Sequence, residues 1–254
     1  GRKKPVVHVS NAAGFGFFDG RNMKFETEKL SKMGVKETWL PEVCTGIEKL
    51  GLYRNRQVTT AIGDNQASFL GAAGKEENTL LVNMGTGGQI SILSDQYFAE
   101  KGIEARPFLD GKYLLVGSSL CGGKSYALLE QFFRRVVKAV TGEDSSLYPV
   151  MEQFAKTGKE QSNRISEDRK LKIRTTFDGT RTDPKSSGSI RGLTSDNFTP
   201  EAFTYGILEG MGDELYQMYR TIKNGTGIQI KNLIGSGNGV RKNPVFCEML
   251  EELF

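Results

Sequence analysis

The chain has 254 residues, of which 37% are hydrophobic and 25% charged, and its formal net charge at pH 7 is +4. These values are typical of a soluble globular protein with one large or two ordinary domains. The small excess of Lys and Arg is spread along the chain, so we expect neither a nucleic-acid nor a membrane-surface partner. No long apolar run and no signal-peptide pattern occurs, so we expect neither a membrane span nor secretion.

Cysteine and histidine are scarce. Cys44, Cys121 and Cys247 lie far apart and form no C-x-x-C pair, which predicts reduced thiols and a cytoplasmic protein. His8 is the only histidine, so neither a His-based metal site nor Ser-His-Asp or Cys-His catalysis is expected, and we predict no metal ligand.

Apolar periodicity and turn residues predict two strands and two short helices in the first part of the chain: strands at 5–10 and 57–62, helices at 25–33 and 66–73. The small residues after the first strand predict a turn, and the second strand is expected to lead directly into Asp64. The charged segment 75–78 is the predicted domain boundary.

Strands separated by short turns dominate the next part and imply antiparallel pairing in part of a sheet. They are predicted at 79–85, 88–93 and 112–119. The helix predicted at 125–140 has apolar residues every three or four positions, which indicates one wide buried stripe. The polar stretch 143–170 is expected to hold only a modest helix around 150–155.

Two further helices have clear start signals. Thr199-Pro200 is expected to begin a long helix, and Asn243-Pro244 a last one. Between them, the segment 230–239 is predicted to be a strand followed by a glycine turn.

Asp64 lies in the segment TTAIGDNQASFLG at residues 59–71. An acid where a strand ends is positioned by the sheet and can still meet a ligand. Gly63 removes bulk beside it, and Asn65 and Gln66 add hydrogen-bonding groups without charge. The same pattern also fits a helix cap, so the spacing alone leaves both interpretations open.

Three glycine turns follow predicted strands, at residues 85–88, 121–124 and 235–239. Glycine lets backbone amides approach an anion, so each turn could bind phosphate, although each could equally be only a tight turn. The third turn has Val240 where the dinucleotide fingerprint needs glycine, and no P-loop motif occurs.

The order of these features resembles the carbohydrate kinases of the FGGY family, in particular their sedoheptulokinase branch. The matching segments are HVSNAAGFGFFD, LPEV, AIGDNQASFLG, LVNMGTGGQIS, DGKYLLVGSSLCGG, FDGTRTDP with GSIRGLT, ILEGM, and LIGSGNGVRKNPVF. The resemblance extends over nearly the whole chain except 143–170. It implies an α/β fold of the actin-like ATPase, ribonuclease H-like class, with a mixed sheet flanked by helices.

The resemblance also implies roles for particular residues. Asp64 matches the catalytic base that takes the proton from a sugar hydroxyl, and Asn65 matches a sugar contact. The residues that match nucleotide contacts are Gly85, Thr86 and Gly87 for the phosphates, Gly122 and Tyr126 nearby, and Gly235, Gly237, Asn238 and Asn243 for the adenosine. The implied cosubstrate is ATP with Mg²⁺. Asp178, Thr180 and Arg181, in the family's signature region, are interpreted as structural.

Parts of the family pattern are missing, including its opening Asp-x-Gly-Thr-[ST] segment. We therefore expect residues 1–73 to be the tail of the N-terminal sugar-binding domain and residues 74–254 to be most of the C-terminal nucleotide-binding domain. As such a piece, the chain alone is expected to be inactive.

The implied reaction is ATP-dependent phosphorylation of a ketose, with sedoheptulose as the first choice and xylulose, ribulose or glycerol as alternatives. A non-catalytic actin-like nucleotide-binding module is the alternative of a different class. The oligomeric state stays open, with a homodimer as the arrangement to test.

Overall fold

The structure is a computed structural model that describes residues 4–100 and 102–254. The chain forms two compact units. The first contains residues 1–80, 91–116 and 222–232, and the second contains residues 81–90, 117–221 and 233–254. Each unit is built from three separate stretches of the sequence, whereas the predicted division is a single boundary between residues 73 and 74. That division stays a prediction.

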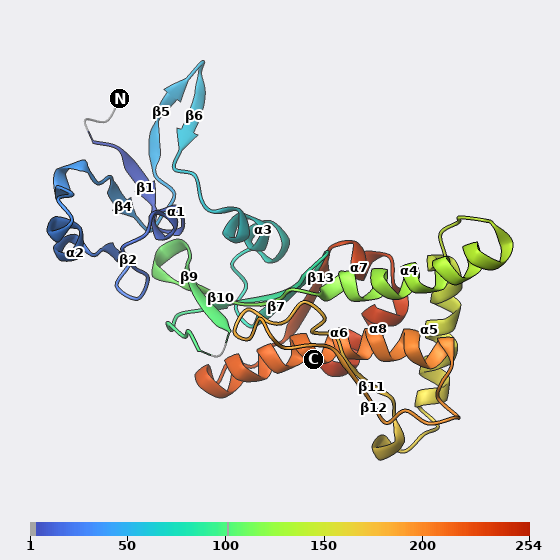
Figure 1. The fold of residues 1–254 in the computed structure, drawn as a ribbon. Coiled ribbons are helices and arrows are strands. Elements are labelled where there is room, and N and C mark those ends of the chain that lie inside the picture. Colours follow the sequence, from blue (N-terminus) through green and yellow to red (C-terminus); the bar gives the residue numbers. More distant parts are fainter. Residues whose placement is uncertain (1–3, 101) are drawn as a thin grey trace. The chain divides into compact units, whose positions relative to one another are not determined.

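Short elements form the N-terminal part of the first unit (Figure 1). They are β1 (Val6–His8), α1 (Val9–Ala12), β2 (Phe18–Asp19), β3 (Lys24–Phe25), α2 (Thr27–Lys32), β4 (Glu42–Cys44), β5 (Lys49–Tyr53), β6 (Arg56–Thr59) and α3 (Asp64–Ala73), with 3-10 turns at Ala13–Phe15 and Glu37–Trp39. β1 pairs with β4 in parallel, whereas β2 with β3 and β5 with β6 are antiparallel. A small core of Ala12, Phe25 and Leu30 packs among them.

The predictions for this part are mixed. The helix ending at Gly74 is confirmed, and its C-terminal glycine has a φ of 64°, a conformation that glycine adopts without strain. The turn expected after the first strand is instead helical, because His8 caps α1 by accepting a hydrogen bond from the Ser10 amide. The helix expected from Phe25 begins only at Thr27, since Phe25 belongs to β3.

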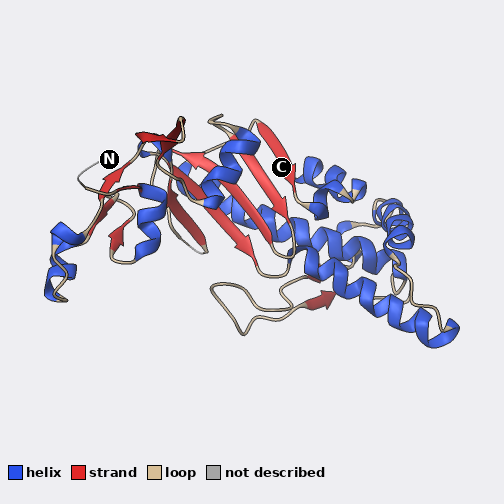
Figure 2. Cartoon of the chain, turned by 90° about the horizontal axis from the view of Figure 1, so that it is seen from above, coloured by secondary structure: helices blue, strands red, loops and turns tan. Residues whose placement is uncertain are grey.

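A five-stranded sheet has the order β13-β7-β8-β10-β9. Its strands are β7 (Thr79–Met84), β8 (Gly88–Ser94), β9 (Ile103–Pro107), β10 (Tyr113–Ser119) and β13 (Asn232–Ser236). Figure 2 shows its long strands side by side. The strands predicted at β7, β8, β10 and β13 are confirmed, while β9 was not predicted. β7 and β8 are neighbours joined only by residues 85–87, a connection too short for anything but a hairpin.

The remaining elements are α4 (Gly122–Thr141), α5 (Tyr148–Ser162), β11 (Lys172–Arg174), β12 (Ser189–Arg191), α6 (Pro200–Thr226), α7 (Asn238–Arg241) and α8 (Pro244–Leu253), with 3-10 turns at Leu109–Gly111 and Glu167–Arg169. β11 and β12 pair antiparallel. The start predicted for α6 is confirmed, because the Thr199 hydroxyl accepts a hydrogen bond from the Ala202 amide at 3.2 Å. The modest helix expected around 150–155 is the longer α5.

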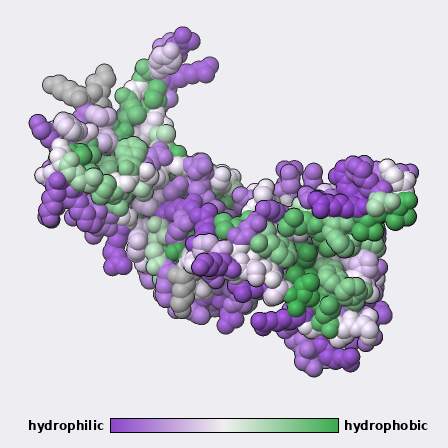
Figure 3. Space-filling view, in the orientation of Figure 1, coloured by the Kyte–Doolittle hydropathy of each residue, from purple (hydrophilic) through white to green (hydrophobic). Residues whose placement is uncertain are grey.

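The stripe on α4 is not fully buried, contrary to the prediction. Leu129 is 8% exposed, but Phe132 is 61% and Val140 81% exposed. Figure 3 shows hydrophobic side chains on this part of the second unit, over α4 and α5. The periodicity is real, but these exposed side chains lie in the second half of α4, so only the first half of the stripe belongs to the core.

Candidate functional site

Asp64 begins α3 instead of ending a strand. β6 ends at Thr59, residues 60–63 have no regular structure, and Gly63 is the N-cap of α3. The predicted direct passage from strand to Asp64 is therefore wrong. The Asp64 carboxylate is exposed and accepts a hydrogen bond from the Asn65 amide at 2.7 Å. An acid in the first helical turn is favoured by the helix dipole and is accessible to a ligand.

The residues after Asp64 anchor α3 within the first unit. Gln66 is 5% exposed and donates to the Pro107 carbonyl at 3.0 Å. Phe69 is fully buried and packs edge to face on Phe108, with ring centroids 5.9 Å apart. In the described part of the chain, the buried Oδ1 of Asn65 has no hydrogen-bond partner. Buried acceptors are normally paired, but because this atom is closed to solvent a ligand hydroxyl could reach it only after the side chain rotates, and the sugar contact of Asn65 stays a prediction.

The first glycine turn connects β7 to β8 in the second unit. The Gly85 amide donates to the Gly87 carbonyl at 3.0 Å, and residues Gly85 and Thr86 are exposed. A Cβ on Gly87 would lie 2.7 Å from the Ser119 carbonyl oxygen. Only glycine fits there without a backbone shift, so the turn approaches β10 closely while its tip faces outward.

The second glycine turn packs on the first. The amides of Gly123 and Lys124 donate to the carbonyls of Gly85 and Thr86, each at 3.0 Å. A Cβ on Gly122 would lie 2.5 Å from the Gly87 carbonyl carbon. The backbone amides of Gly123 and Lys124 therefore already have hydrogen-bond partners within the protein. The close packing of the two turns is sufficient to explain why residue 122 is a glycine. Its contact with nucleotide stays a prediction.

The third glycine turn also lies at the end of β7. Gly237 has a φ of 85°, and a Cβ there would lie 2.7 Å from Asn83 Oδ1 and 2.8 Å from the Met84 carbonyl carbon. Asn238 begins α7 directly after it. A Cβ on Gly235 would lie 2.6 Å from a methyl group of Val240. All three glycine turns therefore converge within the second unit.

Tyr126 and Asn243 lie together in the same unit. Asn243 caps α8, because its Oδ1 accepts from the Phe246 amide at 3.1 Å, and its side chain also hydrogen-bonds Tyr126. Burial raises the pKa of the Tyr126 hydroxyl well above its usual range, and the ring stacks on Tyr148 at 6.0 Å. Both predicted nucleotide residues thus have structural partners, and their contact with a ligand stays a prediction.

Sequence reasoning missed Lys124, which follows the two glycines at the start of α4. Its Nζ lies 2.6 Å from Asp178 Oδ2, and this ammonium group holds the pKa of the Asp178 carboxyl below its usual range. Cys121 also donates to Asp178, at 3.6 Å. The ion pair therefore ties the signature segment to the turn at 121–124, consistent with a structural role for Asp178. A lysine in the first turn after paired glycines was the available signal.

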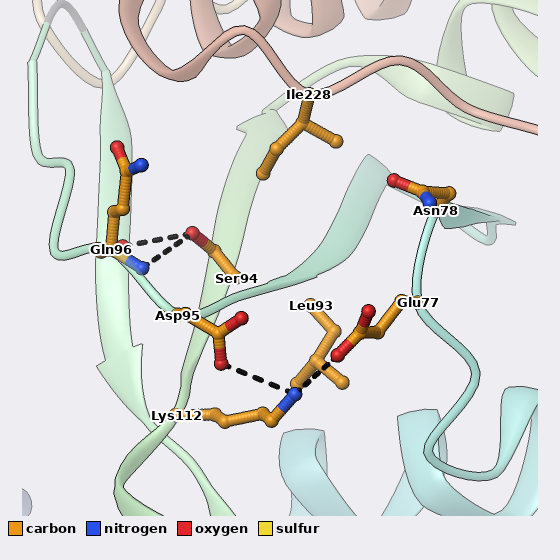
Figure 4. A pocket seen from close by; sticks show the side chains of 8 residues that line it. All are labelled: Glu77, Asn78, Leu93, Ser94, Asp95, Gln96, Lys112 and Ile228. Carbon is orange, nitrogen blue, oxygen red and sulfur yellow. Dashed lines mark hydrogen bonds and ion pairs between the residues drawn. The ribbon is translucent and has the colours of Figure 1, made fainter.

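Two cavities lie away from the predicted site residues. One, of about 120 Å³, is lined by Glu77, Asn78, Leu93, Ser94, Asp95, Gln96, Lys112 and Ile228 (Figure 4). Lys112 Nζ there contacts Glu77 at 2.6 Å and Asp95 at 3.2 Å, so its charge is already neutralised. The other, of about 240 Å³, lies in the second unit beside Tyr205 and Glu209. Within residues 4–100 and 102–254, no cluster of three or more His, Cys, Asp or Glu could hold a metal ion.

Comparison with known proteins identifies the family. The description "FGGY family of carbohydrate kinases, C-terminal domain" matches residues 80–252, more than half of the chain. The chain belongs to the FGGY family of carbohydrate kinases. This FGGY chain is 24% identical to sedoheptulokinase of Mus musculus over 276 residues and 26% identical to glycerol kinase of Bacillus licheniformis over 263 residues. These alignments cover 100% and 96% of the chain but only 55% and 49% of the two relatives, so it spans about half the length of the proteins it matches.

Solved structures support the fold. Xylulose kinase from Rhodospirillum rubrum superimposes with a TM-score of 0.78 at 18% identity, covering 97% of this chain and 50% of that one. Plasmodium falciparum glycerol kinase with ADP gives a TM-score of 0.72 at 19% identity, covering 97% and 49%. The predicted α/β actin-like ATPase class, with a mixed sheet flanked by helices, is confirmed. Among the helices described, none is long and apolar enough to cross a bilayer.

Proposed function

We propose that this FGGY chain serves ATP-dependent phosphorylation of a sugar hydroxyl, with sedoheptulose converted to sedoheptulose 7-phosphate. The observation that carries the proposal is the convergence of three glycine turns at the end of β7. The proposed division is a sugar-binding tail at 1–73 and a nucleotide-binding domain at 74–254. The family match beginning at residue 80 supports it.

The exposed tip of the first glycine turn is suited to the phosphates of ATP. Thr86 supplies a hydroxyl and a backbone amide there, and neither neighbouring glycine places a side chain in the way. Gly122, Tyr126, Gly235, Gly237, Asn238 and Asn243 complete the proposed nucleotide site. Mg²⁺ would enter on the nucleotide phosphates, because this ion commonly binds through substrate phosphates and one or two carboxylates.

Asp64 is the proposed general base. Its exposed carboxylate can accept the proton of a sugar hydroxyl as that oxygen attacks the terminal phosphorus of ATP. The P–O bond to ADP breaks as the new P–O bond forms, and the proton stays on Asp64 until solvent removes it. Asn65, the next residue, is the proposed contact for a second sugar hydroxyl, and its side chain would have to rotate to bring the buried Oδ1 to that hydroxyl. Phosphoryl transfer needs such positioning more than covalent catalysis.

The identity of the sugar substrate is the most specific part of the proposal. Sedoheptulokinase of Mus musculus matches the whole chain at 24% identity, and glycerol kinase of Bacillus licheniformis matches 96% of it at 26% identity. Xylulose, ribulose and glycerol are therefore the competing substrates.

Because the chain spans about half of its relatives, we propose that it is inactive when isolated. A cytoplasmic location is part of the proposal and agrees with three cysteines that form no disulfide. A homodimer remains to be tested by size-exclusion chromatography.

The test is sugar-dependent ADP release by the full-length gene product and its Asp64→Asn variant, screened against sedoheptulose, xylulose, ribulose and glycerol. Loss of a positioned base is expected to lower kcat by about 10²–10⁴-fold while leaving ADP affinity intact. Near-normal turnover by the variant would remove Asp64 from the mechanism. ADP binding without turnover on any acceptor would instead support the non-catalytic nucleotide-binding module.

A further inference from the structure

The segment 60–63, which precedes Asp64, has no regular secondary structure but is bound by two side chains from α1. The Gly63 amide donates to Ser10 Oγ at 2.9 Å, and Asn11 Nδ2 donates to the Ala61 carbonyl at 2.9 Å. These contacts link residues about 50 positions apart within the first unit. The conformation of this loop is therefore defined by contacts with α1 rather than by a helix or sheet of its own.

The hydrogen bonds form a chain from the Gly63 amide through Ser10 and His8 to the Thr45 carbonyl. Each group in this chain donates to the next one. His8 Nε2 lies 3.1 Å from the Thr45 carbonyl oxygen, and because a carbonyl only accepts, Nε2 carries the proton. His8 Nδ1 is then an acceptor, for the Ser10 amide at 3.2 Å and the Ser10 hydroxyl at 2.7 Å. Since that hydroxyl proton points to His8, the Ser10 oxygen keeps a lone pair for the Gly63 amide.

Two members of this arrangement are buried. His8 is 1% exposed and Thr60 is 5% exposed. Thr60 fixes the other end of the segment, because its amide donates to the Glu48 carbonyl at 2.9 Å and its Oγ1 accepts from the Glu48 amide at 3.0 Å. Each of these buried polar groups is paired, which favours one conformation over competing ones.

We propose that His8, Ser10 and Asn11 are positioning residues that fix the start of α3 and with it the Asp64 carboxylate. The inference rests on the proposed function, since it assigns a purpose to the segment that bears the proposed base. Gly63 is the N-cap of α3, and Asp64 is the next residue. A displacement of about 1 Å in a reacting group can cost about 10²-fold in rate, so a weakly bound N-cap would be felt in kcat.

The first experiment compares Ser10→Ala with Ser68→Ala in the full-length gene product. Ser68 is an exposed residue of α3 and serves as the matched control. Ser10→Ala should lower kcat by about 10- to 100-fold and change the KM for ATP by less than about twofold. Hydrogen exchange at the Gly63 amide should quicken by about 3- to 10-fold, the loss expected for one hydrogen bond. Ser68→Ala should change none of these.

The second experiment separates the two faces of His8 and applies even if Ser10→Ala fails to fold. In His8→Asn, the side-chain oxygen can stand near the position of Nδ1 and accept from Ser10. In His8→Gln, the amide group can stand near the position of Nε2 and donate to Thr45, but the acceptor for Ser10 is lost. Positioning through Ser10 predicts a larger fall in kcat for Gln than for Asn, whereas a merely packing role predicts equal losses.

The two experiments also distinguish this inference from the proposed function. Unchanged Gly63 exchange in Ser10→Ala, or equal losses in both His8 variants, would overturn the positioning role even if Asp64→Asn is inactive. Faster Gly63 exchange with full kcat would overturn it as well. Full activity of Asp64→Asn would overturn the proposed function, while the exchange measurement would still report whether Ser10 fixes the segment.

Discussion

Replacing Gly122 by alanine is expected to destabilise the second unit where two glycine turns pack together. The new Cβ would lie 2.5 Å from the Gly87 carbonyl carbon and 2.7 Å from Met84 Sδ, and it would also contact the Gly88 amide nitrogen. Two of these three contacts are with backbone atoms, which cannot rotate away. Either the start of α4 or the turn at 85–88 must therefore move.

The expected cost follows from these contacts. Forcing a methyl group into a packed site costs about 1–3 kcal/mol. The shift also weakens the hydrogen bonds from Gly123 to Gly85 and from Lys124 to Thr86, each contributing about 1 kcal/mol. The better helix propensity of alanine offsets at most about 1 kcal/mol. The net loss in the free energy of unfolding should be about 2–4 kcal/mol.

Urea unfolding followed by circular dichroism measures this loss, with Gly71→Ala as the matched control. Gly71 lies inside α3, and a Cβ added there would have nothing within 4 Å of it. That variant should be neutral or more stable by up to about 1 kcal/mol. If the turn binds phosphate as proposed, Gly122→Ala also weakens ADP binding. Equal stability of Gly122→Ala and the parent chain would refute the packing argument.

Four further substitutions test other parts of the second unit. Burial raises the pKa of Glu209 to about 7. Between about pH 4.5 and 7 the folded state therefore binds more protons than the unfolded state. The free energy of unfolding then falls as pH rises through this window. Glu209→Gln should remove that fall and gain about 1–3 kcal/mol at pH 8, and a parallel pH dependence in both proteins would contradict it. Asn243→Ala removes the cap that pairs with the Phe246 amide and should cost about 1 kcal/mol in thermal unfolding, with no change counting against the cap. Phe132→Ser should cost less than about 0.5 kcal/mol in urea unfolding, whereas Leu129→Ala should cost about 2–5 kcal/mol; equal losses would mean that the exposed end of α4 is covered in solution.

Local signals in the sequence were sufficient for several elements and for the family. The start of α6 was predictable because the Thr199 cap and Pro200 act within one helical turn. The strands β7, β8 and β10 were predictable because continuous apolar runs between turn residues are typical of buried strands. The glycine turns were also predictable, because each is a short motif of neighbouring residues.

Local signals were not sufficient where an element's surroundings decide its role. Periodicity found α4 but not the exposure of Phe132 and Val140, which depends on where the packed neighbours end. The glycines at 122 and 123 suggested phosphate binding, yet the Gly123 amide is bound to Gly85. β9 was missed because Ile103–Pro107 contains charged residues and becomes a strand through pairing with β10.

By itself, the sequence determined the type of many elements and the positions of the glycine turns, because these depend on residues within a few positions of one another. It also showed the membership in the FGGY family, because several such short segments follow one another in the family's order. Only the tertiary structure showed that Asp64 begins a helix and that Ser10 binds the amide of Gly63, 53 residues away. A hydrogen bond between such distant residues depends on the packing of whole elements. No local pattern at either end encodes it.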